Sequence, residues 1–401
     1  MSKVAIIGGG PAGLMAAIEA SKSLNNEVVV FERNEEICKK LLLTGNGRCN
    51  VTSAIPTREM IDYYYDKGDF LYSAFYQFSN HDLIQFLERN GVRTKNENNK
   101  VFPKSEKAND VRALLIDLAK SYSVKFNTNT LVKKVTLKDG FIINGELFTK
   151  LVLATGGITY KSTGSDGIGY QIAKYFGHSI EKPQPVLGSL KTTTFKELQG
   201  LSLDVESLEY YIDDVLVGRE KGSIIFTHFG LSGPPVINLT YHTTCPGANH
   251  KIVIRVYSKN ELGNLLRKKI KLNSSKQMSN VISQTIPSRL TNFLFSNEVL
   301  TKQAAHISNE EIDNIIEKLT NWQVKVFDVF DYDKAMATKG GIKLEEIDPK
   351  TMMSKKIDNL FFAGEILDLV GKTGGYNLQE AFSTGYVAGK TIANKGEINC
   401  G

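Results

Sequence analysis

The hydrophobic and polar positions of the first thirty residues follow two kinds of pattern. The apolar run VAII at residues 4–7 leads into the glycine-rich turn GGGPAG at residues 8–13, and a stretch of small residues follows. A second apolar run, VVVF at residues 28–31, closes the unit. Apolar runs on both sides of a helical stretch predict a β–α–β unit over residues 3–32, with its helix at residues 11–23.

A second group of hydrophobic runs lies between residues 131 and 157, where an Asp-Gly pair and an Asn-Gly pair separate three β-rich stretches. These dipeptides are preferred in two-residue hairpin turns. The pattern predicts a three-stranded meander whose last strand, LVLATGG, runs back toward the core. Helical patterns precede it at residues 80–90 and 110–122.

A change of pattern divides the chain. The segment KPQPVLG at residues 182–188 contains two prolines and a glycine, which mark a boundary. Alternating strand patterns follow, then helical ones, until the glycine-rich, strand-to-helix style resumes near Gly340. We predict an α/β fold with a Rossmann-type nucleotide-binding domain made of residues 1–185 and 336–401. An inserted substrate or cap domain, residues 186–335, is predicted to be β-rich first and then helical.

The amino-acid composition disfavours some classes of binding partner. The 401 residues are 41% hydrophobic and 23% charged, and no apolar run reaches the roughly 18 residues of a membrane helix. We therefore predict a cytoplasmic protein with no membrane partner. The net charge of +6 is mild, and the basic run at residues 267–277 is interpreted as a solvated helix face, so the sequence disfavours a nucleic-acid partner. The four cysteines show no CxxC spacing, which predicts neither a metal site nor a disulfide framework.

The turn between the first two apolar runs has the spacing G-x-G-x-x-G, formed by Gly8, Gly10 and Gly13. The first glycine permits the tight turn, the second lets a pyrophosphate approach the backbone, and the third lets the helix pack closely on the strand. The phosphate then lies at the positive end of the helix. Glu32 ends the second run in the position of a carboxylate that binds an adenosine ribose. The motif predicts a dinucleotide site, and Glu32 disfavours NADP because it would repel a 2′-phosphate.

A second glycine-rich helix start lies near the C-terminus. GKTGGYNLQEA at residues 371–381 follows an apolar run and the carboxylates of Glu365 and Asp368. A helix start offers free backbone N–H groups and a positive dipole end to a ligand oxygen. NAD needs one such clamp, whereas FAD is longer and carries a ring whose reduced form holds negative charge. Two helix starts therefore favour FAD over NAD.

Six motifs stand out in order along the chain: GGGPAG at 8–13, GNGRCNVT at 45–52, ATGG at 154–157, THFGLSGPPVINL at 227–239, TKGGI at 338–342 and FAGEILDLVGKTGGYNLQEAFSTGYVAGK at 362–390. Together they closely resemble those of the bacterial aminoacetone-oxidase-like and BaiN-like NAD(P)/FAD-dependent oxidoreductases. The resemblance covers nearly the whole chain. It implies non-covalently bound FAD in a glutathione-reductase-like domain, and an inserted domain with a β-barrel-like part and a helical part.

The resemblance also implies which residues contact the cofactor. The pyrophosphate would be bound by Gly8, Gly10, Pro11, Ala12 and Gly13, and the adenosine end by Glu32, Arg33 and the backbone of Val132. Ala154, Thr155 and Gly156 would pass under the cofactor, and Gly364, Glu365 and Asp368 would reach its ribityl and phosphate region. The flavin ring would lie near Gly47, Arg48, Cys49 and Asn50, which also neighbour the pyrophosphate, and near Gly375, Tyr376, Asn377 and Leu378.

The catalytic residues are not fixed by these motifs. His228 is a candidate proton donor or base, and Lys339 is a candidate for attracting a substrate anion. A histidine that holds its loop and a solvated lysine explain the same positions. Cys49 near the flavin suggests disulfide reduction, but Cys38 does not form a CxxC pair with it, so dithiol catalysis is not predicted.

Three functions remain open from the sequence. We favour an FAD-dependent oxidoreductase that acts on a small organic molecule by flavin-mediated hydride transfer. It would be either an amine oxidase that uses O₂ or a reductase that uses NAD(P)H as a transient donor, because no second nucleotide domain is visible. An RNA-modifying flavoprotein and a flavin-binding sensor without turnover are the other two. The sequence predicts neither the substrate nor the oligomeric state.

Overall fold

The computed structural model describes residues 2–243, 247–330 and 335–394. By its internal contacts the chain separates into two compact units, residues 1–185 with 333–401 and residues 186–332. The sequence places the two boundaries after residues 185 and 335. Each unit is described by itself below.

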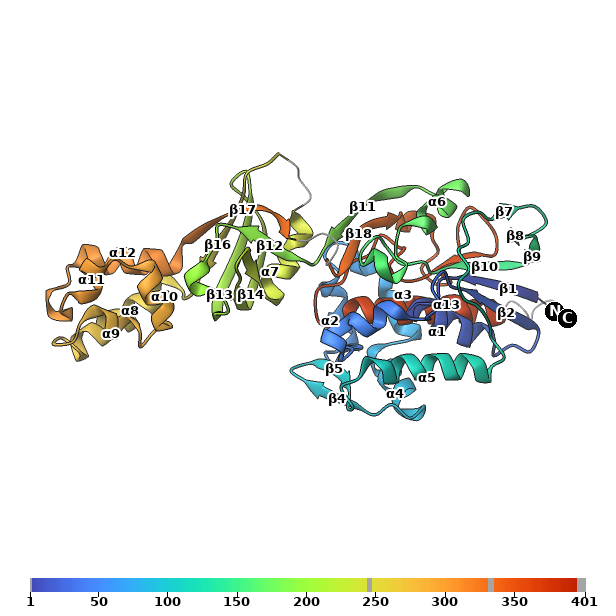
Figure 1. The fold of residues 1–401 in the computed structure, drawn as a ribbon, viewed down its shortest axis with the longest axis horizontal. Helices are drawn as coiled ribbons and strands as arrows, with labels where there is room; N and C mark the ends of the chain where they lie inside the picture. Colours follow the sequence, from blue (N-terminus) through green and yellow to red (C-terminus); the bar gives the residue numbers. More distant parts are fainter. Residues whose placement is uncertain (1, 244–246, 331–334, 395–401) are drawn as a thin grey trace. The chain divides into compact units, whose positions relative to one another are not determined.

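A five-stranded parallel sheet forms the centre of the first unit (Figure 1). β1 (Ser2–Ile7) pairs with β2 (Asn26–Phe31) on one side and with β10 (Lys150–Leu153) on the other. β6 (Lys125–Asn127) and β19 (Leu360–Phe362) are the outer strands. The middle of β1 is fully buried, which explains why these strands read as unbroken apolar runs rather than alternating ones. The sequence analysis missed β6, since KFN has no such run.

The predicted meander is partly wrong. β7 (Thr136–Leu137), β8 (Phe141–Ile143) and β9 (Glu146–Phe148) form a small antiparallel sheet of their own. The strand of LVLATGG is β10, which belongs instead to the central parallel sheet between β1 and β19. All four residues of β10 are buried, so it takes a central place in the covered sheet rather than the edge of a hairpin.

Two helices with glycines at their contact pack against each other in the first unit. α1 (Pro11–Ala20) follows β1, and α13 (Tyr376–Asn394) lies alongside it (Figure 1). A Cβ added at Gly385 would lie 2.3 Å from the carbonyl oxygen of Ala12, so only glycine permits this approach. Ala12, at the start of α1, therefore packs against the middle of α13.

Shorter elements surround this core. β11 pairs with β18, and β3, β5 and β4 form a three-stranded sheet. These elements are η1 (Lys39–Gly47), β3 (Thr52–Ser53), α2 (Thr57–Met60), α3 (Tyr72–Gln77), α4 (Asn80–Arg89), β4 (Thr94–Glu97), β5 (Lys100–Pro103), α5 (Ala108–Ser121), η4 (Lys161–Thr163), α6 (Ile168–Tyr175), β11 (Ile180–Val186) and β18 (Ala337–Ile342).

The second unit combines a six-stranded closed barrel with a group of helices, as the resemblance implies. Phe226 of the barrel stacks on Trp322 with ring centroids 5.7 Å apart, in a core that the helices share. The barrel strands are β12 (Ser189–Thr192), β13 (Ser202–Ile212), β14 (Val215–Phe226), β15 (Gly230–Ser232), β16 (His250–Arg255) and β17 (Trp322–Phe330). The helices are α7 (Pro234–Leu239), α8 (Lys259–Leu272), α9 (Met278–Ile282), α10 (Ser288–Leu294), α11 (Asn297–Thr301) and α12 (Asn309–Thr320).

The predicted α/β fold class is confirmed by this architecture. None of the helices in the described ranges has the length and apolar character needed to cross a bilayer.

A hydrogen-bond network around the buried His178 joins the residues just before β11 to the segment that precedes β19. His178 Nδ1 lies 3.0 Å from Glu346 Oε2, and its Nε2 lies 2.9 Å from Ser354 Oγ. The Ser354 hydroxyl accepts the N–H groups of Lys356 and Ile357, so its own proton is donated to Nε2. His178 is therefore neutral, with its proton on Nδ1 donated to Glu346. Burial lowers the pKa of His178 below its usual value, which agrees with this assignment.

Replacing His178 should change how stability depends on pH. A neutral buried histidine contributes fully above its unfolded pKa of about 6.5 and loses that contribution as pH falls through its lower folded value. The pKa of Glu346 is lowered to about 2, so its contribution stays constant between pH 5.5 and 7.5. His178→Gln should therefore lower the thermal midpoint at pH 7.5 by the equivalent of roughly 1 to 3 kcal/mol, and by less at pH 5.5.

The matched control is His81→Gln, at an exposed position of α4. Its midpoint should follow the wild type at both pH values in the same thermal scans. A His178→Gln deficit that stays the same or grows toward pH 5.5 would contradict the neutral network.

Candidate cofactor site

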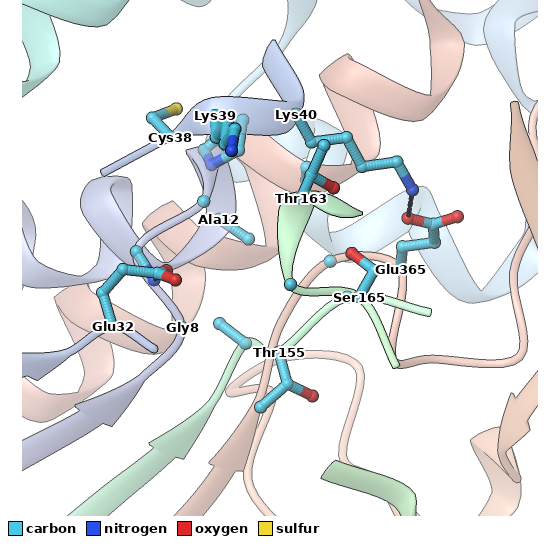
Figure 2. A pocket seen from close by; sticks show the side chains of 18 of the residues that line it. Gly8, Ala12, Glu32, Cys38, Lys39, Lys40, Thr155, Thr163, Ser165 and Glu365 are labelled. Carbon is cyan, nitrogen blue, oxygen red and sulfur yellow. Dashed lines mark hydrogen bonds and ion pairs between the residues drawn. The ribbon is translucent and has the colours of Figure 1, made fainter. Parts of the chain in front are cut away.

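A pocket opens beside the carboxyl ends of the central strands, where ligands bind in open parallel sheets. Ile7 at the end of β1, Phe31 at the end of β2 and Ala154 just after β10 all line it. The pocket holds about 1150 Å³ of empty space including its open mouth, which suits a large cofactor. Figure 2 shows side chains that line it.

The first glycine loop forms one wall, and each of its glycines has a different steric reason. Gly8 has φ +109°, and a Cβ there would lie 2.3 Å from the carbonyl oxygen of Ala154. A Cβ at Gly13 would lie 2.0 Å from the carbonyl oxygen of Gly8. A Cβ at Gly10, by contrast, meets no protein atom within 4 Å. Gly8 and Gly13 are therefore required by packing, whereas Gly10 borders open space.

The space beside Gly10 fits a phosphate group. Gly10 is the N-cap of α1, its backbone is extended, and no side chain caps the helix. The first N–H groups of a helix have no partners within it, and the helix dipole places partial positive charge there. Open space at an uncapped helix start is what a bound pyrophosphate needs. The start of α1 therefore has the space and the charge that the phosphates of a dinucleotide require.

Glu32 lies at the end of β2 and is held in place by the backbone around it. Its Oε2 accepts the N–H of Gly9 at 2.9 Å, and its Oε1 accepts the backbone and side-chain N–H groups of Asn34 at 2.9 and 2.8 Å. Glu32 lines the pocket beside Gly8 (Figure 2). A fixed carboxylate at this position is suited to accept hydrogen bonds from ribose hydroxyls.

An ion pair lines another part of the pocket. Lys40 Nζ lies 2.7 Å from Glu365 Oε2 and 2.9 Å from the hydroxyl of Thr159 (Figure 2). Glu365 Oε1 also accepts the backbone N–H of Thr338 at 2.9 Å. The pair is only partly exposed, with about a fifth of each side chain accessible. Glu365 thereby joins four segments of the first unit at the pocket wall.

The C-terminal glycine loop is braced by a side chain of the helix it precedes. Asn377 Oδ1 accepts the N–H of Gly371 at 2.8 Å, and Asn377 Nδ2 donates to the carbonyl of Gly371 at 2.7 Å. Asn377 and Leu378, in the first turn of α13, line the pocket. The starts of α1 and α13 therefore border the same cavity.

More than half of the residues predicted to hold the cofactor line this pocket. Their roles stay predictions, but the fold brings them together from six separate stretches of chain. They are Gly8, Gly10, Pro11, Ala12, Glu32, Arg33, Val132, Ala154, Thr155, Gly156, Gly364, Glu365, Asn377 and Leu378.

The other predicted cofactor residues do not line the pocket. Gly13 lies within α1 against Gly8, and Gly375 packs on the backbone of Thr52, where a Cβ would lie 2.6 Å away. The full set is Gly13, Gly47, Arg48, Cys49, Asn50, Asp368, Gly375 and Tyr376.

Asp368 and Tyr376 make packing and polar contacts of their own. Asp368 is buried, forms an ion pair with Lys67 and accepts the N–H of Gly340 at 3.1 Å. The ring of Tyr376 stacks on Tyr63 with centroids 4.4 Å apart. Both residues brace the loops beside the pocket rather than its wall.

The GNGRCN segment, residues 45–50, begins within η1 and continues past its end. Arg48 lies over the ring of Phe102, 4.2 Å from its centroid, and pairs with Glu97 and Glu106. Cys49 is fully buried, and burial raises its pKa to about 12. Its side chain therefore stays a thiol at neutral pH and is not available as a nucleophile. Asn50 Oδ1 is buried without a hydrogen-bond partner among the described residues. Arg48 Nε is likewise buried without a partner among the described residues, and because unpaired buried polar atoms are costly, both residues are candidates for contact with a ligand.

The two candidate catalytic residues lie outside the pocket. His228 is an exposed residue of the second unit between β14 and β15, with its ring edge against Phe229. Lys339 lies in β18 of the first unit. Neither residue lines the pocket, and their catalytic roles stay predictions.

Several pocket residues are not among the predicted cofactor contacts. Gly9, Ala363 and Ala381 lie inside the motifs, whereas most of the others lie in segments that reach the pocket only through tertiary contacts, so spacing gives no signal for them. They are Gly9, Cys38, Lys39, Lys40, Leu41, Thr44, Thr130, Leu131, Thr163, Gly164, Ser165, Ile168, Met336, Ala363 and Ala381, together with Ile7 and Phe31 of the strands.

A buried carboxyl group lies one turn into α13. Glu380 is 2% exposed, and its Oε1 has no hydrogen-bond partner among the described residues. Burial, together with the nearby charge of Glu365, raises the pKa of Glu380 well above its usual value. A buried carboxylate with an unpaired oxygen is costly, so burial favours the protonated form of Glu380.

Comparison with known proteins agrees with this geometry. Residues 2–391 match the family described as HI0933-like protein Rossmann domain. The 3-dehydro-bile acid delta(4,6)-reductase of Clostridium scindens is 30% identical over 98% of this chain and 100% of its own length. The ribosomal RNA dihydrouridine synthase of Haemophilus influenzae is 27% identical over 97% of this chain and 98% of its own. A solved 3-ketosteroid delta1-dehydrogenase from Sterolibacterium denitrificans shares the fold, with 12% identity, a TM-score of 0.52, and coverage of 98% and 100%.

The fold and the matches define the class: a flavoprotein oxidoreductase with a Rossmann-type nucleotide-binding domain. Within that class, the chain belongs to the HI0933-like family, which confirms the resemblance drawn from its motifs.

Gly10→Ala should separate cofactor binding from folding. The added methyl group meets no protein atom and fits the extended backbone of Gly10, so the thermal midpoint should stay within about 2 °C of the wild type. The methyl group would occupy space needed by a pyrophosphate, and FAD affinity measured by titration calorimetry should fall at least about tenfold. The comparison variant is Gly13→Ala, which should lower the midpoint because its Cβ would collide with Gly8. Unchanged FAD affinity in Gly10→Ala would contradict this placement of the phosphate.

Glu380→Gln should change how the stability of the protein depends on pH. Because the folded pKa of Glu380 is raised, the native state holds a proton that the unfolded chain has lost, and stability falls as pH rises above about 4.5. Glutamine does not titrate, so the variant should gain thermal midpoint relative to the wild type between pH 5 and pH 8. Glu27→Gln, which alters an exposed carboxylate with a lowered pKa, should show no such relative gain. Parallel curves for Glu380→Gln and the wild type would show that Glu380 is not a buried neutral acid.

Proposed function

We propose that the chain is an FAD-dependent reductase that adds hydrogen across a carbon–carbon double bond conjugated with a carbonyl group in a small organic molecule. The observation that supports it most is the single pocket bordered by two helix starts, with Glu32 in one part of its wall and Asn377 in another. A pocket of this kind suits a cofactor longer than NAD. The family match points to the same cofactor class.

The reaction is inferred from what two relatives have in common. A delta(4,6)-reductase acting on a 3-oxo bile acid and a dihydrouridine synthase are both named for hydrogenating a double bond next to a carbonyl. The two substrates differ greatly in size, but the bond reduced is electron-poor in both. This shared chemistry favours a reductase over the amine oxidase that the sequence leaves open.

The protein's own groups would bind and orient the cofactor. FAD, when bound, supplies the hydride chemistry. The N–H groups at the start of α1 would hold phosphate, and Glu32 would accept ribose hydroxyls. The start of α13 would stabilise negative charge on the ring by about 0.3 to 2 kcal/mol. Lys40 would add positive charge at the wall, balanced by Glu365.

A second candidate is reduction of uridine in ribosomal RNA, and the synthase relative supports it. The basic helix α8 would supply positive charge for the RNA phosphates, although Arg267 in this helix is already paired with Asp313. RNA binding would depend steeply on salt, because each phosphate contact releases a counterion.

The experiment is anaerobic stopped-flow absorbance of the FAD-loaded protein. We expect NADH or NADPH to bleach the flavin band, and a 3-keto-4-ene steroid or cyclohexenone to restore it at least about tenfold faster than buffer alone. Restoration by uridine-rich ribosomal RNA and not by the enones would establish the second candidate instead. Bleaching by amines with peroxide release in air, and none by NAD(P)H, would contradict the reductase.

A further inference from the structure

The segment of residues 159–167 forms a wall of the pocket that no motif assigns. It connects the turn after β10 to α6, and its only regular structure is the short helix η4. Thr163, Gly164 and Ser165 line the pocket, which also includes Gly8–Ala12, Glu32, Arg33 and Lys40 of the opposite rim. Figure 2 shows Thr163 and Ser165 beside the pair of Lys40 and Glu365.

One end of this segment is anchored at the rim near Glu32. Arg33 forms an ion pair with Asp166 and donates a long hydrogen bond of 3.5 Å to the carbonyl of Gly164. Asn34 Nδ2 donates to the carbonyl of Thr163 at 2.9 Å. The same Asn34 holds Glu32 Oε1, so the anchor and the predicted adenosine end share a residue.

The other end is anchored at the ion pair. The Thr159 hydroxyl lies 2.9 Å from Lys40 Nζ and 3.3 Å from Glu365 Oε1. Two separated anchors thus fasten one short segment to Arg33 and Asn34 at one end and to Lys40 and Glu365 at the other. Neither Thr159 nor Asp166 itself lines the pocket.

The backbone of the segment turns sharply at three places. Tyr160, Gly164 and Gly167 have φ values of 54°, 102° and 83°, in the left-handed region that side chains disfavour. Hydrogen bonds within the segment, such as that from the N–H of Thr163 to the carbonyl of Tyr160 at 2.7 Å, hold its turns, and the two anchors tie it to the pocket. Releasing the anchors therefore frees the segment without unfolding the sheet below it.

We propose that residues 159–167 are a strap that closes over the bound dinucleotide and limits its entry and release. The proposal rests on FAD occupying the pocket, as inferred above. The strap joins the rim of Arg33 and Asn34 to that of Lys40 and Glu365, so the cofactor passes it on the way in and out. The partly exposed ion pair to Asp166 adds little to global stability, which suits a contact that opens and closes.

The test variant changes only the strap's anchors and replaces no residue that lines the pocket. Asp166→Asn removes the charge that binds Arg33 while keeping an oxygen for the N–H of Ile168, which Asp166 Oδ1 accepts at 3.1 Å. Thr159→Val removes the hydroxyl at the second anchor with little change of shape. The double variant Asp166→Asn/Thr159→Val therefore loosens both ends.

The measurement is the rate of FAD association and dissociation, followed by the return of free-flavin fluorescence after dilution and by its quenching on mixing. We expect both rates to rise at least about fivefold in the double variant, because a gate slows passage in both directions. The matched control is Glu27→Gln, which removes an ion pair with Lys125 away from the pocket and should leave both rates unchanged.

Each outcome separates the strap from simpler accounts. A faster release with an unchanged association rate would show a lost contact and overturn the gate. A lower thermal midpoint with both rates unchanged would show a purely structural loop and overturn it as well. A well-folded wild type that binds no FAD would overturn the proposed function together with the strap.

Discussion

The close approach of backbone to backbone around α1 is the constraint on which the site depends. Gly13 lets α1 pack on the turn after β1, and Gly385 lets α13 pack on α1, in both cases at distances that no side chain allows. These contacts fix how the two helices lie against each other. The uncapped start of α1 and the first turn of α13 both border one pocket at the carboxyl ends of the strands, and the start of a helix carries partial positive charge.

Three charged groups of the pocket wall are bonded within the chain. The carboxylate of Glu32 is fixed by backbone N–H groups, and Lys40 is balanced by Glu365. Burial of Glu380 raises its pKa and favours its protonated form. The pocket wall thus combines fixed acceptors, one balanced cation and helix dipoles, an environment that can bind an anionic cofactor without leaving a buried charge unpaired.

The sequence predicted the parts of the pocket that local geometry determines. The glycine spacing and Glu32 predicted one wall, because a turn between a strand and a helix in a β–α–β unit always brings these positions to the carboxyl end of the strand. It failed where long-range packing decides, because β10 joined the central sheet instead of the hairpins. Lys40 and the strap residues gave almost no signal, since ordinary turn residues become a pocket wall only when distant segments meet.

The most direct test of the central claim is a structure of the chain crystallised with FAD. We predict adenosine beside Glu32, pyrophosphate at Gly10 and the start of α1, and the flavin ring near Asn377 at the start of α13. A cofactor that reaches only one of the two helix starts, or a flavin ring bound outside this pocket, would contradict the account.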